Sequence, residues 1–212
     1  MGDRPRSTSR DLERYAGLFA RRTQGMGLAG AAGVRPFLPA LLSGALGRAD
    51  LGLDFDHTRY AFLESNWFLI AVVVLLILTV VIERRSPGAA ESGTFGAALG
   101  GVAVGIGTLL FAGSLADTGH ESWPGILGGI ACAVLGYYAL AALFSRARRR
   151  LAGSGGAVTL LGLYADGIAL ALAGLSILFP PIAYAALVVF VVLIARARTE
   201  SAQKYEGLRS LR

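Results

Sequence analysis

Long apolar runs separated by short polar segments dominate the sequence. Six such runs occupy residues 24–47, 61–82, 94–115, 123–144, 157–179 and 181–195. About 20 apolar residues in a helix suffice to cross the roughly 30 Å hydrocarbon core of a bilayer. The pattern therefore predicts an all-α, polytopic membrane helical bundle with six transmembrane helices. The last run is short for a full span, so its flanking arginines reach up to the interface or the bilayer thins locally.

The composition excludes a soluble globular chain. Hydrophobic residues make up 54% of the 212 residues and charged residues only 16%, against about 25% charged in soluble domains. The net charge of +6 comes from basic residues between the apolar runs, as in juxtamembrane anchors. Basic patches with interleaved stacking aromatics are missing, so we expect no nucleic-acid partner. The single cysteine, Cys132, leaves no intramolecular disulfide or cysteine metal cluster.

The basic residues also predict the orientation. Residues 1–22 hold six, the 83–93 loop two, the 145–154 loop four and the C-terminal tail five, which places seventeen on one side. The other side holds only Arg48 and Arg59. By the positive-inside rule both termini are then cytoplasmic, and an odd number of spans would destroy this asymmetry.

Three parts of the chain follow from this organisation. Residues 1–22 form a cytoplasmic basic amphipathic segment, residues 23–198 a six-span membrane domain and residues 199–212 a cytoplasmic tail. In the first part Leu12, Tyr15, Ala16 and Phe19 recur at helical spacing, with arginines elsewhere on the wheel. This pattern favours a helix lying on the membrane surface; a frayed basic tail is the alternative.

A charge and two prolines interrupt the first apolar run. An arginine at bilayer depth is costly, and Pro36 and Pro39 remove two backbone donors from the helix. We therefore predict that the first helix is broken at Arg35-Pro36 and that the charge has a partner. Asp166, near the centre of the 157–179 run, is the candidate, which places both charges near the midplane.

Two interpretations of these charges remain open. Arg35 and freed backbone N–H groups could form a substrate or ion site at a discontinuous helix, with Pro36, Pro39 and the hydroxyl of Tyr164 beside it. The pair could instead be structural and fix how two spans pack. Tyr164 would then be a buried aromatic residue whose hydroxyl bonds to a nearby carbonyl.

Small residues recur at four-residue intervals within the spans. They are Gly25, Ala29 and Gly33; Gly96 and Gly100; Gly101 and Gly105; Gly125 and Gly129. Such stripes let helix backbones approach closely, so we expect them at helix contacts. The alternative is that they line a substrate path.

The outward loops hold the histidines of the chain. Asp54, Asp56 and His57 lie in one loop, and Asp117, His120 and Glu121 in the next. These groups can bind a divalent cation, but their spacing matches no known metal motif. We expect no metal site and no cofactor.

The sequence lacks the residues that membrane enzymes need. Intramembrane aspartyl and serine proteases and phosphatidyl-alcohol transferases each require residues that the spans do not supply. The Asp166-Gly167 pair, for example, stands without the further aspartates of the transferases. We therefore expect a protein that is not an enzyme.

Two segments resemble a known family. Gly33-Val34-Arg35-Pro36-Phe37-Leu38-Pro39, followed by Leu41-Leu42-Ser43-Gly44, resembles the Gly-x-(Asn/Arg)-x-(Tyr/Phe)-Leu-Pro signature of an uncharacterised bacterial integral-membrane family, a domain of unknown function. Asn66-Trp67-Phe68-Leu69-Ile70 resembles its second span. The resemblance covers mainly the first 85 residues, and the ending Glu83-Arg84-Arg85 departs from the acidic-Lys-Ile-Pro of relatives. It implies a plasma-membrane location and no established activity.

These observations lead to two hypotheses. The first is a multi-pass protein of the bacterial plasma (inner) membrane that acts as a transporter or channel-like carrier for an unknown small solute or ion. The second is a non-transporting membrane scaffold or assembly subunit. In both, the lipid bilayer is the partner, and a homo-oligomer is left open.

Overall fold

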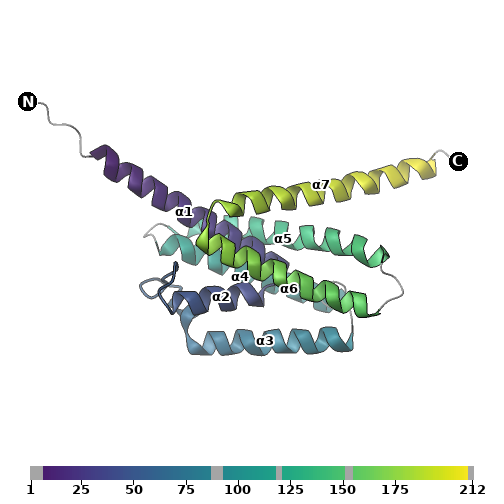
Figure 1. Ribbon diagram of the computed structural model, residues 1–212, viewed down its shortest axis with the longest axis horizontal. Coiled ribbons are helices and arrows are strands. Elements are labelled where there is room, and N and C mark those ends of the chain that lie inside the picture. Colours follow the sequence, from purple (N-terminus) through teal and green to yellow (C-terminus); the bar gives the residue numbers. More distant parts are fainter. Residues whose placement is uncertain (1–6, 87–92, 118–120, 151–154, 210–212) are drawn as a thin grey trace, which may run out of the picture.

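All regular structure in the described residues, 7–86, 93–117, 121–150 and 155–209 of a computed structural model, is helical. The elements are α1 (Ser7–Val34), α2 (Phe37–Gly47), the 3-10 turn η1 (Ala61–Glu64), α3 (Asn66–Arg85), α4 (Gly93–Ala116), α5 (Trp123–Arg150), α6 (Gly155–Leu178) and α7 (Ile182–Arg209). The long helices lie roughly side by side in one bundle (Figure 1). The all-α prediction is confirmed.

Within the part of the chain that the structure describes, five helices are long and apolar enough to cross a membrane, which indicates a multi-pass membrane protein. Their apolar segments are Asn66–Arg85, Gly93–Ala116, Trp123–Phe144, Leu160–Leu178 and Ile182–Thr199. These agree within a few residues with five of the six predicted runs. The last segment is 18 residues long, which is longer than the predicted run 181–195. The helix continues beyond that run, so the segment is not short for a span.

The remaining predicted run, 24–47, which is the first in the chain, is not confirmed as a span, because it is divided between two helices. In α1, Gln24 donates from Nε2 to the carbonyl oxygen of Gly52, which lies beyond the end of α2, at 3.0 Å. The neighbouring Gly27 packs against Ser176, and Gly52 packs against Ile177. Both contacts are at the C-terminal end of α6. The start of this part of α1 and the end of α2 therefore lie together.

The chain thus reverses between α1 and α2. Arg35, at the junction of the two helices, lies away from these contacts, beside Asp166 near the middle of α6. We call residues 24–47 the helical hairpin. Each arm has about 11 residues and measures about 16 Å at 1.5 Å per residue, roughly half of a bilayer core. A hydropathy pattern reports the length of an apolar run but not the direction of the chain, so the reversal was missed.

The reversal affects where α1 begins relative to the end of α7. In Figure 1 the start of α1 projects from one end of the bundle, and the end of α7 from the other. The prediction that both termini are cytoplasmic stays a prediction. The amphipathic prediction for residues 1–22 falls on side chains that mostly lie outside the described ones, and it stays a prediction.

The core forms where α1 packs against α4 and α5. A Cβ added to Gly33 would collide with the carbonyl oxygen of Ala133, and one added to Gly129 would lie 2.7 Å from the Cα of Thr108. These glycines of the predicted stripes therefore do lie at close backbone contacts. Gly101 and Gly105 were expected at contacts too, but nothing lies within 4 Å of their added Cβ atoms. They face outward on α4.

Candidate functional site

The junction between α1 and α2 is built by proline. The N–H of Arg35 donates to the carbonyl of Ala31 at 3.0 Å and closes the last turn of α1. Pro36 follows with φ −66° and ψ −40° as the N-cap of α2, and Pro39 lies in its first turn. The first four N–H groups of a helix have no partner within it, so proline loses nothing there. Both prolines therefore start a helix rather than break one.

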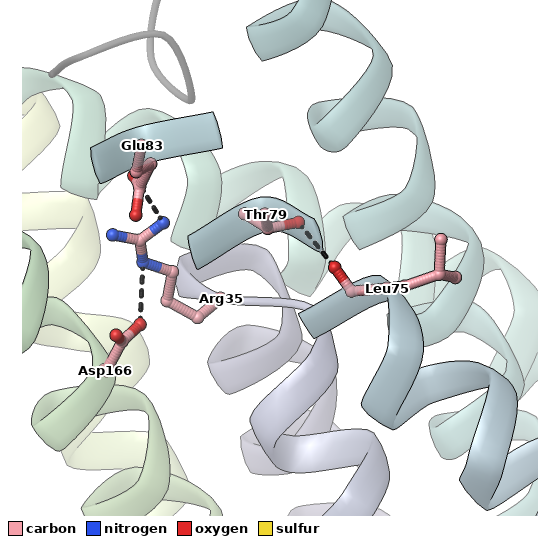
Figure 2. A network of polar contacts seen from close by, with 5 residues as sticks. All are labelled: Arg35, Leu75, Thr79, Glu83 and Asp166. Atoms are coloured by element: carbon pink, nitrogen blue, oxygen red, sulfur yellow. Dashed lines mark hydrogen bonds and ion pairs between the residues drawn. The ribbon is translucent and has the colours of Figure 1, made fainter. Parts of the chain in front are cut away.

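Two carboxylates from different helices hold the Arg35 side chain (Figure 2). Its Nη1 lies 2.9 Å from Oε1 of Glu83 in α3, and its Nε lies 2.9 Å from Oδ1 of Asp166 in α6. The side chains are 12%, 22% and 28% exposed for Arg35, Glu83 and Asp166. The buried Nη2 atom has no hydrogen-bond partner. We call these three residues the charged triad.

The turn at Gly162 makes room for the guanidinium. Gly162 lies one helical turn before Asp166 in α6, and a Cβ added there would lie 3.3 Å from Nη2 of Arg35. That distance is tighter than ordinary van der Waals contact. A glycine at this position lets the guanidinium lie close to the backbone of α6.

Asp166 and Glu83 lie at different positions along their helices. Asp166 is near the middle of α6, whereas Glu83 is only two residues from the end of α3. Arg35 therefore joins a carboxylate at mid-helix to one near a helix end. The predicted pairing of Arg35 with Asp166 is present.

Two small cavities meet at Arg35. One, of about 40 Å³, lies between the hairpin tip, α4 and α5 and includes Tyr137 in its lining. The other, of about 20 Å³, is lined by Glu83, Asp166, Thr79 and apolar residues of α2, α3 and α4. A water molecule needs about 10–15 Å³ by this kind of measure. The cavities therefore have room for water-sized species and for nothing as large as a sugar or an amino acid.

The structure distributes the predicted site residues unequally. Arg35, Pro36 and Asp166 line the smaller cavity together. Pro39 is buried in the first turn of α2 and lines neither cavity. Tyr164 is 65% exposed, because it projects from the outer side of α6, so its proposed hydroxyl contribution to the site is wrong.

Glu83 is the residue that sequence reasoning missed. It stands directly before Arg84 and Arg85, where a carboxylate is easily taken for part of the charged helix end. Arg35 and Asp166 already balanced each other, so nothing in the pattern required a third charge. The usable signal was an acidic residue directly after an apolar run and before two arginines.

A second polar cluster lies at the other end of the bundle. Carboxylate oxygens of Asp54, Asp56 and Glu64 lie within 4.8 Å of one another. The N–H of Phe55 donates to Oε1 of Glu64 at 2.7 Å. Burial raises the pKa of Glu64, the Phe55 N–H opposes this, and the charge of Asp56 adds to it. Exposed acidic groups of this kind are common without a metal.

The loop residues that the sequence analysis considered as cation ligands differ from this cluster. Glu64 was not among them, although it is the most buried of the three carboxylates. His57 is exposed and is not in the cluster, and His120 lies outside the described residues.

Comparison with known proteins places the chain in a family. A family model described as Domain of unknown function (DUF4126) matches residues 23–200. The protein belongs to the DUF4126 family. No curated protein and no solved structure matches the chain. Membership in DUF4126 confirms the expectation of an uncharacterised family, and it extends that expectation from the first 85 residues to nearly the whole helical bundle.

The DUF4126 match begins at the hairpin rather than at the chain start. Residue 23 is a buried residue of α1, and residue 200 lies within α7. The charged triad, both cavities and all five apolar helices fall inside the matched range. The family description assigns no activity, so function has to be argued from the site.

Proposed function

We propose that this DUF4126 protein is a membrane carrier for a small ion or solute, with the charged triad as its site. The observation that carries the proposal is a guanidinium bound by carboxylates from α3 and α6 at the tip of a helical hairpin. Ionisable residues within membrane segments usually serve function. Helix ends that meet inside a bundle form the ion and substrate sites of many transporters.

The arrangement suits a site that changes state. The Arg35–Glu83 pair connects α3 to the hairpin tip, and α3 lies at the edge of the bundle (Figure 1). A bound ion that weakened this pair would free the end of α3 and open the small cavity beside it. Tight backbone packing of α1 on α4 and α5 would hold the rest in place.

We place the carrier in the bacterial plasma membrane with the lipid bilayer as its partner. Exposed apolar side chains such as Trp67 on α3 and Val188 on α7 suit contact with lipid. The C-terminal ends of α3, α5 and α7, where basic residues gather, lie at one end of the bundle (Figure 1). The positive-inside rule assigns this end to the cytoplasm. The N-terminal end of α1 would then lie on the opposite side.

A non-transporting scaffold is the second candidate, and the closed packing favours it. Both carboxylates are paired with Arg35, and the cavities beside it are no larger than a few water molecules. In this case the charged triad only fixes the hairpin against α3 and α6.

Flux measurements with one variant separate the two candidates. Asp166→Asn removes one charge but leaves Arg35 paired with Glu83, so the fold should persist. Purified protein in liposomes would be tested for flux of protons, sodium, chloride and inorganic phosphate. A carrier is expected to lose most of its flux in Asp166→Asn.

The matched control is Tyr164→Phe, on the outer side of the same helix. It should leave flux at the wild-type level. Flux that is equal in wild type and Asp166→Asn, or an absence of flux above that of empty liposomes for all four ions, would rule out the carrier proposal for these ions and favour the scaffold.

A further inference from the structure

The charged triad is not electrically balanced. Ionised Glu83 and Asp166 bring two negative charges to the single positive charge of Arg35, and both ion pairs are 2.9 Å long. A net charge of this kind in a water-poor bundle is costly. The ends of the hairpin helices do not remove it. The negative C-terminal end of α1 and the positive N-terminal end of α2 meet at Arg35 and largely cancel.

The surrounding helices do not supply the missing positive charge. Arg84 and Arg85 follow Glu83 in α3, but both are exposed. α4 contributes Leu99 to both cavities, and α5 contributes the neutral Tyr137 to the larger one. α7 lines neither cavity. The described residues around the triad therefore leave one negative charge over.

The smaller cavity beside the triad offers both space and oxygen atoms for a cation. The cavity of about 20 Å³ is bordered by Glu83, Asp166 and Thr79. Arg35 uses one oxygen of each carboxylate, which leaves the second oxygen of each for another partner. The Thr79 hydroxyl donates to the carbonyl of Leu75 at 2.8 Å, so its oxygen lone pairs remain able to accept.

We propose that the charged triad binds one small monovalent cation, either a proton or a metal ion of about the size of sodium, and no anion. The single excess charge sets the valence, and the water-sized cavity sets the size. Hard monovalent cations prefer the carboxylate and hydroxyl oxygens found here. An anion would meet an arginine already engaged by two carboxylates. The idea that the carrier moves this cation, or uses it for coupling, rests on the proposed function. The idea that the triad binds the cation does not.

Stability in detergent tests this binding directly. A cation that binds only the folded protein raises its melting temperature in a saturable way. One arm replaces choline chloride by lithium, sodium or potassium chloride at constant ionic strength. The other arm varies pH in choline chloride. Wild type is expected to respond in at least one arm, and the responding arm identifies the metal ion or the proton.

Variants of the two carboxylates assign the response to the triad. Asp166→Asn and Glu83→Gln each neutralise the excess charge and leave Arg35 one partner. Each is expected to weaken the apparent affinity by about tenfold or more, which corresponds to about 1.4 kcal/mol. Asp166→Glu keeps the charge and should retain the response. Asp56→Asn, in the acidic cluster at the other end of the bundle, should leave the response to metal cations unchanged.

Several results would overturn the inference. They are a wild type that responds to neither cations nor pH, a response that is the same in wild type and in both neutral variants, and a response to cations that Asp56→Asn removes. Stabilisation by chloride or phosphate that depends on Arg35 would also overturn it. A cation response without flux in liposomes would support this inference and contradict the carrier proposal. Flux without any cation response would support the carrier proposal and contradict this inference.

Discussion

At the residue scale, Glu64 shows how burial acts on an ionisable group outside the apolar helices. Only 7% of Glu64 is exposed, in the η1 turn beside Asp54 and Asp56. Its pKa is raised above the ordinary value of a glutamate, chiefly by burial. Folding therefore favours the protonated form. The stability that Glu64 contributes is complete below about pH 4.5 and is lost as the pH rises through its folded pKa.

This linkage predicts the effect of Glu64→Gln. The amide oxygen of glutamine can still accept the Phe55 N–H, while the buried charge is gone. The variant should melt at a higher temperature than wild type at pH 8, and the difference should disappear near pH 4.5. Thermal unfolding in detergent across this range measures it, with the exposed Asp50→Asn as control. A difference that grows as the pH falls would contradict the assigned burial cost.

The pairing of Arg35 with Asp166 was predictable at this scale because a charge inside an apolar run needs a partner. Asp166 was the carboxylate available within another run. The side on which Tyr164 faces was not predictable, because α6 is apolar nearly all round and its pattern does not mark an inner face.

At the element scale, glycine decides which helices form the core. Gly136 of α5 lies against the α1 backbone, and an added Cβ would meet the carbonyl group of Gly30 and lie 3.3 Å from the Cα of Gly33. A backbone cannot move aside as a side chain can. The close approach of α1 and α5 therefore requires glycine at position 136, because the methyl group of alanine would collide with the α1 backbone.

Two glycine substitutions test this packing. Gly136→Ala should destabilise the bundle by about 1–3 kcal/mol, the usual cost of overpacking. Gly101→Ala, with open space around its added Cβ, should be neutral or slightly stabilising because alanine favours helix. Apparent melting temperatures of the two variants in detergent give the comparison. Equal melting temperatures would show that α1 and α5 are not in backbone contact.

The five long helices were predictable from hydropathy alone, and the hairpin was not. Gly33 to Pro36 separates two apolar arms of about 11 residues, each too short to cross a bilayer. The pattern of residues 24–47 is the same for one interrupted span and for two antiparallel arms. Only contacts such as Gln24 with Gly52 decide between them.

At the scale of the whole molecule, the hairpin determines the topology. It contributes two half-length arms instead of a span, so five apolar spans remain among the described residues. The start of α1 and the end of α7 lie at opposite ends of the bundle (Figure 1). The charge-counting argument assigned the six arginines of residues 1–22 to the side of the C-terminal tail, and that assignment stays a prediction. The charged triad exists because the reversal brings Arg35 to Glu83 and Asp166.

Single-cysteine labelling tests the reversal most directly. Cys132 is buried and can be replaced to give a background without cysteine. Arg22→Cys, before the hairpin, and Ala49→Cys, after it, are both exposed positions. The hairpin predicts that a membrane-impermeant thiol reagent labels both from the same side, and Ser86→Cys at the end of α3 from the other. Labelling of residue 22 from the side of residue 86 would contradict the hairpin and the site built on it.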